Sequence, residues 1–519
     1  MTGERAAATT LPSARQARRG QQRRGGPAGS RSARSVAVTL VILLMLLGAG
    51  LRLLRIGRES LWIDEGYTAY LVRLTPQEYV DNVLHTVRNI LPPLYFNLLH
   101  YWTALAGSSE TALRLPSAVA GVLAIPVLYA LVARCFDRTA GLLAATALAL
   151  SLFHLRYSQE ARMYELLAML SLLSLYLLVR LVQGGGARST VLLAVVDAAI
   201  VYTHHYGALL LIAEAAWLAG LALARDLPPG AGRRWLLSRA LFAVLILPWA
   251  VIFADQVHKV SQYPWLPPTT ARSIYDVLVY FAGTPWCLAA LGLLVLAGLP
   301  SRRGLPGRLW ARAGLTADDR GYLLLWSVAV VPVVLAFGYS VVVSPVFGQK
   351  YLIASCTALL ALAALGARRL PGRVLPAVAL VAALAVATPE WLHYYRDVTK
   401  EQWREATAFV DGGAAPGDLV LFNAGYGRQN GYEVYTRRSD LVAKAFPLGS
   451  DEFATLPTPT DLAGLAPLVR GHRHAWIVYE QSPDHDATIA QTLGGLSAGG
   501  ECRAFVGLQV CRYDLRPAG

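Results

Sequence analysis

Apolar runs long enough to cross a bilayer recur along most of this chain and restrict it to a membrane fold. A bilayer's hydrocarbon core is about 30 Å thick, and about 20 helical residues span it. Eleven runs approach that length, near residues 35–54, 111–134, 139–157, 165–183, 189–206, 207–224, 237–254, 274–299, 321–343, 351–367 and 374–391. With 55% hydrophobic and only 15% charged residues, the composition predicts a polytopic α-helical membrane protein.

The arginines predict how the chain is oriented. Residues 1–35 hold eight arginines and few apolar residues, which predicts a disordered cytoplasmic arm. The following run is long for a signal peptide and lacks a small-residue cleavage site over 51–58, so we expect a retained first helix. With the N-terminus inside, every break assigned to the cytoplasm is basic. The net charge of +14 therefore reflects membrane orientation rather than a nucleic-acid partner, and eleven spans place the C-terminus outside.

Two regions depart from simple spans. Residues 55–110 predict a long outer loop within a transmembrane domain of residues 36–391. In this loop, 76–88 reads as a surface helix and 92–102, rich in Tyr, His and Trp, as a helix resting in the interface. If 92–102 crossed the membrane instead, the count would be twelve and the C-terminus would lie inside.

Residues 392–519 have the composition of a small α/β extracytoplasmic domain. Helices are expected over 403–412, 461–471 and 486–495, strands over 418–425 and 475–480, and a closing hairpin over 502–513. Cys502 and Cys511 could face each other across that hairpin, and an outer location would permit a disulfide. A disulfide and two reduced, buried cysteines both stay open, because sequence gives no geometry.

Four polar clusters fall on the predicted outer face. They are LWIDEGYTAY with Asp64 and Glu65, HLRYSQEARMYEL with Arg156, Glu160, Arg162, Tyr164 and Glu165, THHYG with His204, His205 and Tyr206, and FGQKYL with Lys350 and Tyr351. Each has a structural explanation, such as a paired polar turn, a hydrogen-bonded histidine scaffold or a snorkelling lysine. However, a charge at a helix centre costs about 2.5–3.5 kcal/mol on insertion scales. Four such clusters on one side of the membrane therefore predict a functional site.

These motifs, together with PPLYFNLLHYW and RLPSAVAGVLAIPVLYALVAR, occur in the order seen in bacterial family 39 glycosyltransferases. The chain resembles this group, which is related to protein O-mannosyltransferases and to the aminoarabinose transferase that modifies lipid A. The resemblance covers residues 36–391 and implies the integral-membrane GT-C fold. Two positions depart from many relatives: Leu91 stands where a histidine precedes the paired prolines, and Lys350 stands in place of an arginine.

The resemblance implies an inverting transfer of a sugar, mannose most commonly, from a polyprenyl phosphate to an acceptor hydroxyl outside the cytoplasmic membrane. No Walker loop or Rossmann glycine fingerprint is present, as expected for an enzyme without a nucleotide donor. Asp64 would take the acceptor's proton, while Glu65 would orient Asp64 or the acceptor. Arg162 and Lys350 would offset charge on the leaving phosphate. The residues expected to bind substrate are Glu160, Arg162, Tyr164, His205, Tyr206, Lys350 and Tyr351.

Several alternatives stay open. Asp64 and Glu160 have the ligand type for a divalent cation, but no spacing diagnoses a metal, and no cofactor is expected with certainty. The transferred group is a hexose or a pentose, and the acceptor is a lipid, a glycan or a protein. A transporter or flippase of lipid-linked sugars would also use outer-face charges, although we see no Gly/Pro-broken repeats. A polysaccharide polymerase or ligase would use an oligosaccharide donor.

Overall fold

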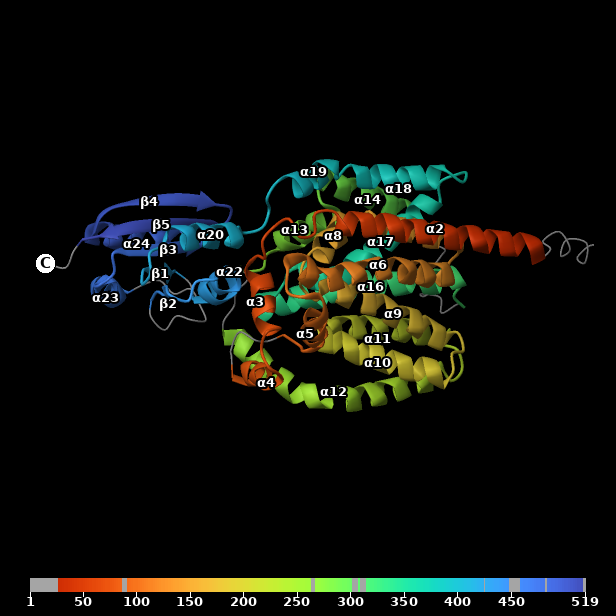
Figure 1. Ribbon diagram of the computed structural model, residues 1–519. Helices are drawn as coiled ribbons and strands as arrows, with labels where there is room; N and C mark the ends of the chain where they lie inside the picture. Colours follow the sequence, from red (N-terminus) through yellow and green to blue (C-terminus); the bar gives the residue numbers. More distant parts are fainter. Residues whose placement is uncertain are drawn as a thin grey trace, which may run out of the picture.

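The computed structural model describes residues 27–85, 91–262, 267–300, 307–308, 314–423, 425–447, 458–480 and 483–516. A bundle of apolar helices makes up most of it, and a smaller unit of strands and helices lies at one end (Figure 1). The first helix begins at Pro27, before the expected start at Ser35. The preceding part of the predicted cytoplasmic arm lies outside the described residues.

Within the described part of the chain, six helices are long and apolar enough to cross a membrane. The elements that contain them are α2 (Pro27–Leu53), α6 (Glu110–Cys135), α9 (Tyr164–Val182), α12 (Ala231–Gln262), α16 (Ala317–Val342), and α17 (Ile353–Arg368) with the preceding η1 (Gln349–Leu352). The chain is therefore a multi-pass membrane protein, as predicted.

Bent helices account for further crossings. The bent pairs are α7 (Arg138–Ala149) with α8 (Leu152–Ser158), α13 (Ala271–Ala282) with α14 (Pro285–Ala297), and α18 (Leu375–Ala385) with α19 (Thr388–Arg396). Counting each pair as one span gives up to nine candidates among the described residues. The 17-residue helices α10 (Ala187–Thr203) and α11 (Gly207–Leu223) are shorter. The total of eleven spans stays a prediction.

Charged side chains inside the bundle are paired. Glu165, in the second polar cluster, accepts from His154 at 2.9 Å, and the other ring nitrogen of His154 lies 3.1 Å from the Thr357 hydroxyl. Arg239 forms an ion pair with Asp197. Pairing of this kind is what keeps ionisable groups tolerable in a membrane interior, so these residues have structural partners within the bundle.

Three short helices of the outer loop lie between the bundle and the strands: α3 (Ile63–Leu71), α4 (Pro76–His85) and α5 (Leu94–Ala106). The latter two correspond to the two helices predicted for this loop, and the end of the first prediction, 86–88, lies outside the described residues. Figure 1 shows α3 on the side of the bundle that faces the strand-bearing unit. Asp64 and Glu65 are in the first turn of α3.

The strand-bearing unit contains one sheet in the order β2-β1-β3-β5-β4. Its strands are β1 (Leu419–Phe422), β2 (Val442–Ala445), β3 (His474–Glu480), β4 (Ser497–Phe505) and β5 (Leu508–Leu515). β1 pairs in parallel with β2 and β3, whereas β5 is antiparallel to both β3 and β4. Its helical segments are α20 (Trp403–Gly413), α21 (Gly425–Gly427), η2 (Arg428–Tyr432), α22 (Glu433–Tyr435), α23 (Pro459–Val469) and α24 (Pro483–Leu496).

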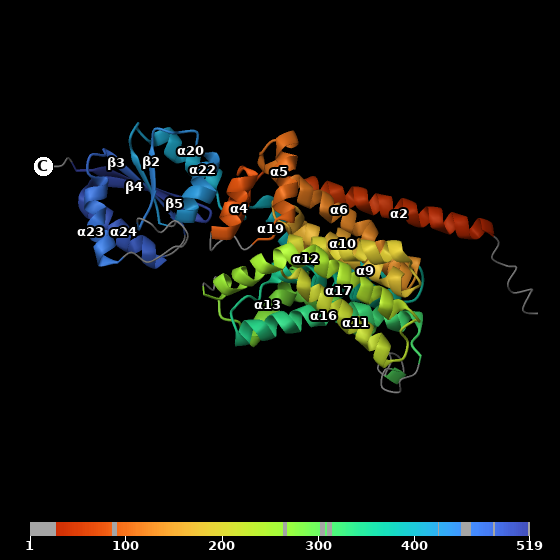
Figure 2. The same ribbon diagram turned by 90° about the horizontal axis from the view of Figure 1, so that it is seen from below.

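Alternating side chains give the sheet two apolar faces. Val420 and Phe422 of β1 pack with Trp403 of α20. Leu419 and Leu421 pack on the opposite face, with α23 and α24. Figure 2 shows α20 and α22 toward the helical bundle and α23 and α24 away from it. The predicted α/β elements are present in this arrangement, while the independence of residues 392–519 as a domain stays a prediction.

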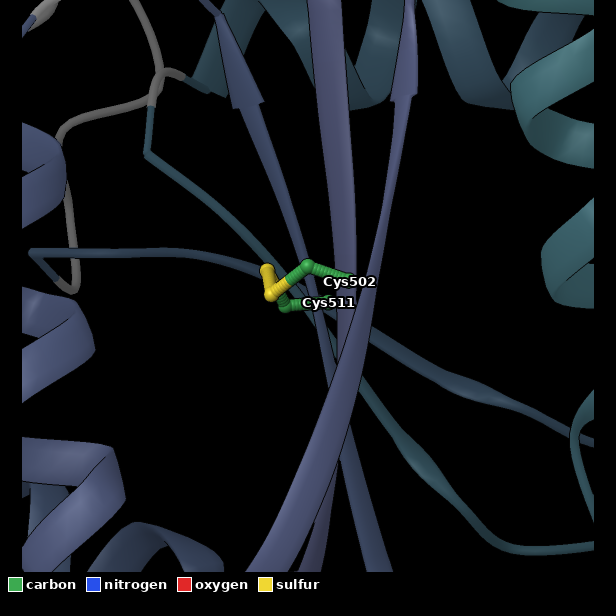
Figure 3. Close-up of a disulfide and its surroundings, with 2 residues drawn as sticks. All are labelled: Cys502 and Cys511. Atoms are coloured by element: carbon green, nitrogen blue, oxygen red, sulfur yellow. A yellow bond between two sulfur atoms is a disulfide. The ribbon is translucent and has the colours of Figure 1, made fainter.

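The closing hairpin settles the state of its cysteines. Cys502 of β4 lies directly opposite Cys511 of β5 in the antiparallel register, with a Cα–Cα distance of 4.0 Å and a bond between the sulfur atoms. Figure 3 shows this disulfide across the two strands. Of the two alternatives that the sequence left open, the structure has the disulfide.

Candidate active site

The two neighbouring carboxylates of α3 point in different directions. Successive residues of an α-helix are rotated by about 100°, so Asp64 and Glu65 cannot share one face. The Asp64 side chain is 33% exposed, whereas that of Glu65 is 0% exposed. Asp64 is therefore the carboxylate that another molecule can reach.

Asp64 lies between two cations from distant parts of the chain. Lys350 places Nζ 3.2 Å from Oδ2, and Nη2 of Arg162 lies 3.8 Å from the same oxygen. Burial opposes ionisation, but Lys350 and Arg162 more than offset it and hold the pKa of Asp64 below its ordinary value. Asp64 is thus ionised at neutral pH, and the structure brings together three residues that the sequence proposed for one site.

Glu65 forms a buried ion pair with Arg114. Nε and Nη2 of Arg114 donate to its two oxygens at 2.8 and 2.7 Å. The other three N–H groups of Arg114 donate at 2.8 to 2.9 Å to the carbonyls of Ile56, Glu59 and Ser60. All five guanidinium donors therefore have an acceptor, and they fix the chain just before α3.

Further donors surround Glu65, among them the Trp62 amide, which donates to Oε2 at 3.5 Å. The Ala161 amide donates to Oε1 at 2.7 Å, and Lys400 donates to Oε2 at 3.0 Å. Burial opposes ionisation of Glu65, but Arg114 and Lys400 lower its pKa to about 2. This network fixes Glu65 and the helix turn that it shares with Asp64; that Glu65 orients Asp64 or the acceptor stays a prediction.

The loop between α8 and α9 carries Glu160 and Arg162. Arg162 donates to the Asp64 carbonyl at 3.3 Å and to the Thr68 hydroxyl at 3.4 Å. In Glu160, Oε2 is buried and has no hydrogen-bond partner. An unsatisfied buried oxygen is costly, which makes Glu160 a candidate to receive a hydroxyl or a cation from a bound molecule.

A cavity of about 740 Å³ begins beside Arg162. Its polar end is formed by Arg162, Tyr164, His204, His205, Tyr206 and Tyr351. The rest of its wall is mainly apolar and comes from α11, α12, α16 and the residues before α5. Because Arg162 both lines the cavity and contacts Asp64, the reachable carboxylate lies next to its polar end.

Stacked rings form the floor of that polar end. The rings of Tyr206 and Tyr351 are stacked with centroids 4.7 Å apart, and His204 lies 5.1 Å from Tyr351. His205 turns toward α12, where the Trp249 indole donates to its Nε2 at 3.3 Å. Burial lowers the pKa of His205 to about 4, so this histidine is neutral at physiological pH.

Comparisons with known proteins agree with this architecture. Residues 91–257, about a third of the chain, match the family model described as dolichyl-phosphate-mannose-protein mannosyltransferase. ArnT from Cupriavidus metallidurans in the apo state is 14% identical with a TM-score of 0.61, and the match covers 92% of this chain and 98% of ArnT. The chain has the GT-C fold.

Two other solved structures share the GT-C fold with this chain. ArnT from Cupriavidus metallidurans bound to undecaprenyl phosphate is 15% identical with a TM-score of 0.57, covering 91% of this chain and 97% of that one. The oligosaccharyltransferase AglB from Archaeoglobus fulgidus, in complex with an inhibitory peptide and a dolichol-phosphate, is 12% identical with a TM-score of 0.52 over 92% of this chain and 74% of AglB. The resemblance inferred from the motifs is confirmed. No curated protein sequence matches this chain.

Sequence reasoning missed two residues of this candidate site. Arg114 lies in the motif RLPSAVAG, and Lys400 is one of only four lysines in the chain. The motif and the rarity of lysine are the two sequence features that could have pointed to these residues. Their partner Glu65 is 49 and 335 positions away, respectively. Contacts over such separations follow from the three-dimensional fold, which a single sequence does not show.

The sequence leaves open a divalent cation at Asp64 and Glu160. Among the residues that the structure describes, no group of three or more His, Cys, Asp or Glu side chains could hold an ion. In this candidate site the Asp64 carboxylate is paired with Lys350 and Arg162. A divalent cation at Asp64 and Glu160 stays a prediction.

Glu160 should make folding stability depend on pH near neutrality. Burial is the main cause that raises its pKa from 4.5 to about 7; Lys400 opposes this rise, and Glu65 adds to it. The folded protein therefore keeps a proton that the unfolded chain releases at lower pH, so stability should fall as pH rises through about 7. Thermal unfolding in nanodiscs should show this fall in the wild type and a flatter curve for Glu160→Gln. The exposed Glu433→Gln is the control, and an unchanged curve for Glu160→Gln would contradict this prediction.

Proposed function

We propose that this protein is a membrane glycosyltransferase that moves one sugar, mannose or a similar hexose or pentose, from a polyprenyl phosphate to an acceptor hydroxyl. The observation that carries the proposal is a partly exposed, ionised Asp64 that lies between two cations, one of which, Arg162, lines the polar end of a large apolar cavity. Such a site offers a base, a place for a phosphate and room for a hydrocarbon chain.

The cavity wall supports a lipid-linked donor. Ile212 of α11 and Val334, Leu335 and Tyr339 of α16 line the cavity and are also exposed on the helix surfaces. Their exposed apolar surface suits contact with a hydrocarbon chain. A polyprenyl chain can therefore lie along this wall while its phosphate stays at the polar end, consistent with the undecaprenyl phosphate in the similar ArnT structure.

The chemistry is a single displacement. The acceptor oxygen forms a bond to the anomeric carbon as the bond between that carbon and the phosphate oxygen breaks. The acceptor's proton passes to Asp64, and the polyprenyl phosphate leaves with the bonding electron pair, so the anomeric configuration inverts. Because its pKa is lowered, Asp64 is a weak base and takes the proton late, once the attacking hydroxyl has become acidic.

The cations beside Asp64 suit the leaving group. Arg162 and Lys350 can each turn part of their charge toward the phosphate as negative charge grows on it, where a low dielectric makes such contacts strong. Tyr164, Tyr206 and Tyr351 provide ring faces and hydroxyls for the sugar, His205 borders the same space, and Glu160 can accept from sugar hydroxyls. We place this site on the outer face, with the N-terminus in the cytoplasm and residues 392–519 outside.

A transfer assay tests the proposal directly. Protein in nanodiscs is incubated with radiolabelled polyprenyl-phosphate sugars, mannose first and then other hexoses and pentoses, with a membrane extract as the acceptor pool. We expect label to move from one of these donors to a new product whose anomeric configuration is inverted. Absence of transfer from every monosaccharide donor would contradict the proposal and direct attention to transport or to an oligosaccharide donor.

A further inference from the structure

The segment that joins α19 to α20 passes over the helix that carries Asp64. Lys400, in this segment, is 11% exposed. Its Nζ donates to Glu65 of α3 and to the carbonyl of Gln159, each at 3.0 Å. One ammonium group therefore ties α3 to the loop that holds Glu160 and Arg162.

The next residue caps α3. Oε2 of Glu401 accepts from the amide of Ile63, the first residue of the helix, at 3.1 Å and from the Trp403 indole at 2.7 Å. Trp62, at the N-cap position, makes no side-chain capping hydrogen bond. A carboxylate at a helix N-terminus pairs with free amides and with the positive end of the dipole. The first turn of α3 thus takes its cap from the strand-bearing unit's leading segment.

Backbone contact fixes the other side of α3. A Cβ added to Gly66 would lie 1.6 Å from the carbonyl oxygen of Asn430 in η2. The hydroxyl of Tyr435 in α22 accepts from the Leu61 amide at 2.7 Å. The residues before and after Asp64 are therefore both held by the C-terminal unit.

We infer that Lys400, Glu401, Asn430 and Tyr435 position Asp64 for the transfer, with Lys400 as the central positioning residue. The inference rests on the proposed function, in which Asp64 is the base. A base must lie within hydrogen-bond reach of the proton it takes, and a misplacement of about 1 Å can cost about 10²-fold in rate. The C-terminal unit then contributes to the active site by holding α3 in place.

Lys400 can be removed without dismantling the fold. In Lys400→Met, Glu65 keeps both donors from Arg114 and the Ala161 amide. What is lost is the link between α3, the Glu160 loop and the segment leading to α20. We therefore expect a properly inserted variant in which α3 is less restrained.

The test combines transfer kinetics with hydrogen exchange. In Lys400→Met we expect kcat to fall roughly 10-fold to 100-fold, from the loss of hydrogen bonds to a charged group, with the KM for the lipid donor nearly unchanged. Amide exchange over residues 60–71 should become faster. Lys400→Arg should recover part of both, and Lys444→Met, at an exposed position of β2, should match the wild type.

A second variant disturbs another contact between α3 and the C-terminal unit without altering charge. Gly66→Ala forces α3 away from Asn430, whereas Gly50→Ala in α2 meets nothing within 4 Å. We expect Gly66→Ala to lower kcat and to speed exchange over 60–71, with Gly50→Ala as the matched control.

Amide exchange and transfer kinetics together distinguish the positioning role of the C-terminal unit from the proposed function. Faster exchange with lower kcat supports the positioning role. Faster exchange, with a wild type that transfers no sugar, supports positioning while contradicting the proposed function. Unchanged exchange over 60–71 in both Lys400→Met and Gly66→Ala overturns the inference, whatever the activity.

Discussion

Asp64→Asn should remove sugar transfer while leaving the protein folded and inserted. The amide keeps the shape of the carboxylate but cannot accept the acceptor's proton. General-base catalysis typically contributes on the order of 10² to 10⁴ in rate. We expect at least that loss in kcat, measured by label transfer from the polyprenyl-phosphate donor found active with the wild type.

Two comparisons make this result specific. Asp81→Asn changes an exposed carboxylate of α4 and should transfer at the wild-type rate. Asp64→Asn should still bind the unlabelled donor, because the substitution leaves the cavity unchanged. This binding is measured as the rise in the variant's unfolding temperature when the donor is added. Transfer by Asp64→Asn within a few-fold of the wild type would exclude Asp64 as the base.

Arg114→Met should be the most destabilising change at the site. It leaves Glu65 buried with only part of its compensating charge and strips the donors from the carbonyls of Ile56, Glu59 and Ser60. Removing one partner of a buried ion pair typically costs about 3–5 kcal/mol. We expect a large fall in the melting temperature in nanodiscs and a low yield of folded protein.

An exposed arginine provides the control for Arg114→Met. Arg272, on α13, is 83% exposed and pairs with Asp276 one turn away, so Arg272→Met should change stability by less than about 1 kcal/mol. Adding Glu65→Gln to Arg114→Met should recover part of the loss, because the uncompensated carboxylate is then gone. A double variant no more stable than Arg114→Met would show that the lost carbonyl contacts, rather than the charge, dominate.

Much of the membrane architecture follows from simple patterns in the sequence. Runs of about 20 apolar residues have few other uses, so helices such as α6, α9 and α16 could be placed within a few residues. For Asp64, Arg162 and Lys350 the sequence predicts only that all three lie on the same side of the membrane. Their actual proximity depends on how η1 and the α8–α9 loop pack against α3.

The different tasks of the paired carboxylates could not be foreseen. Asp64 and Glu65 are chemically similar neighbours, and which of them faces inward is decided by the docking of α3 against Arg114 and Lys400. The disulfide was open for the same reason, since the register of β4 against β5 decides whether Cys502 meets Cys511. The orientation of the two carboxylates and the cysteine pairing are therefore both decided by how one segment packs or pairs with another. Local secondary-structure propensity does not determine either of them.

The apolar wall of the cavity changes what substrate concentration means for this protein. A lipid-linked donor whose chain lies along Ile212, Val334 and Leu335 arrives by lateral diffusion in the membrane plane. Its occupancy is then set by its mole fraction among the surrounding lipids, not by its amount per volume of solution. Adding unlabelled lipid or detergent would dilute the donor in two dimensions and slow turnover, even with every molar concentration held constant.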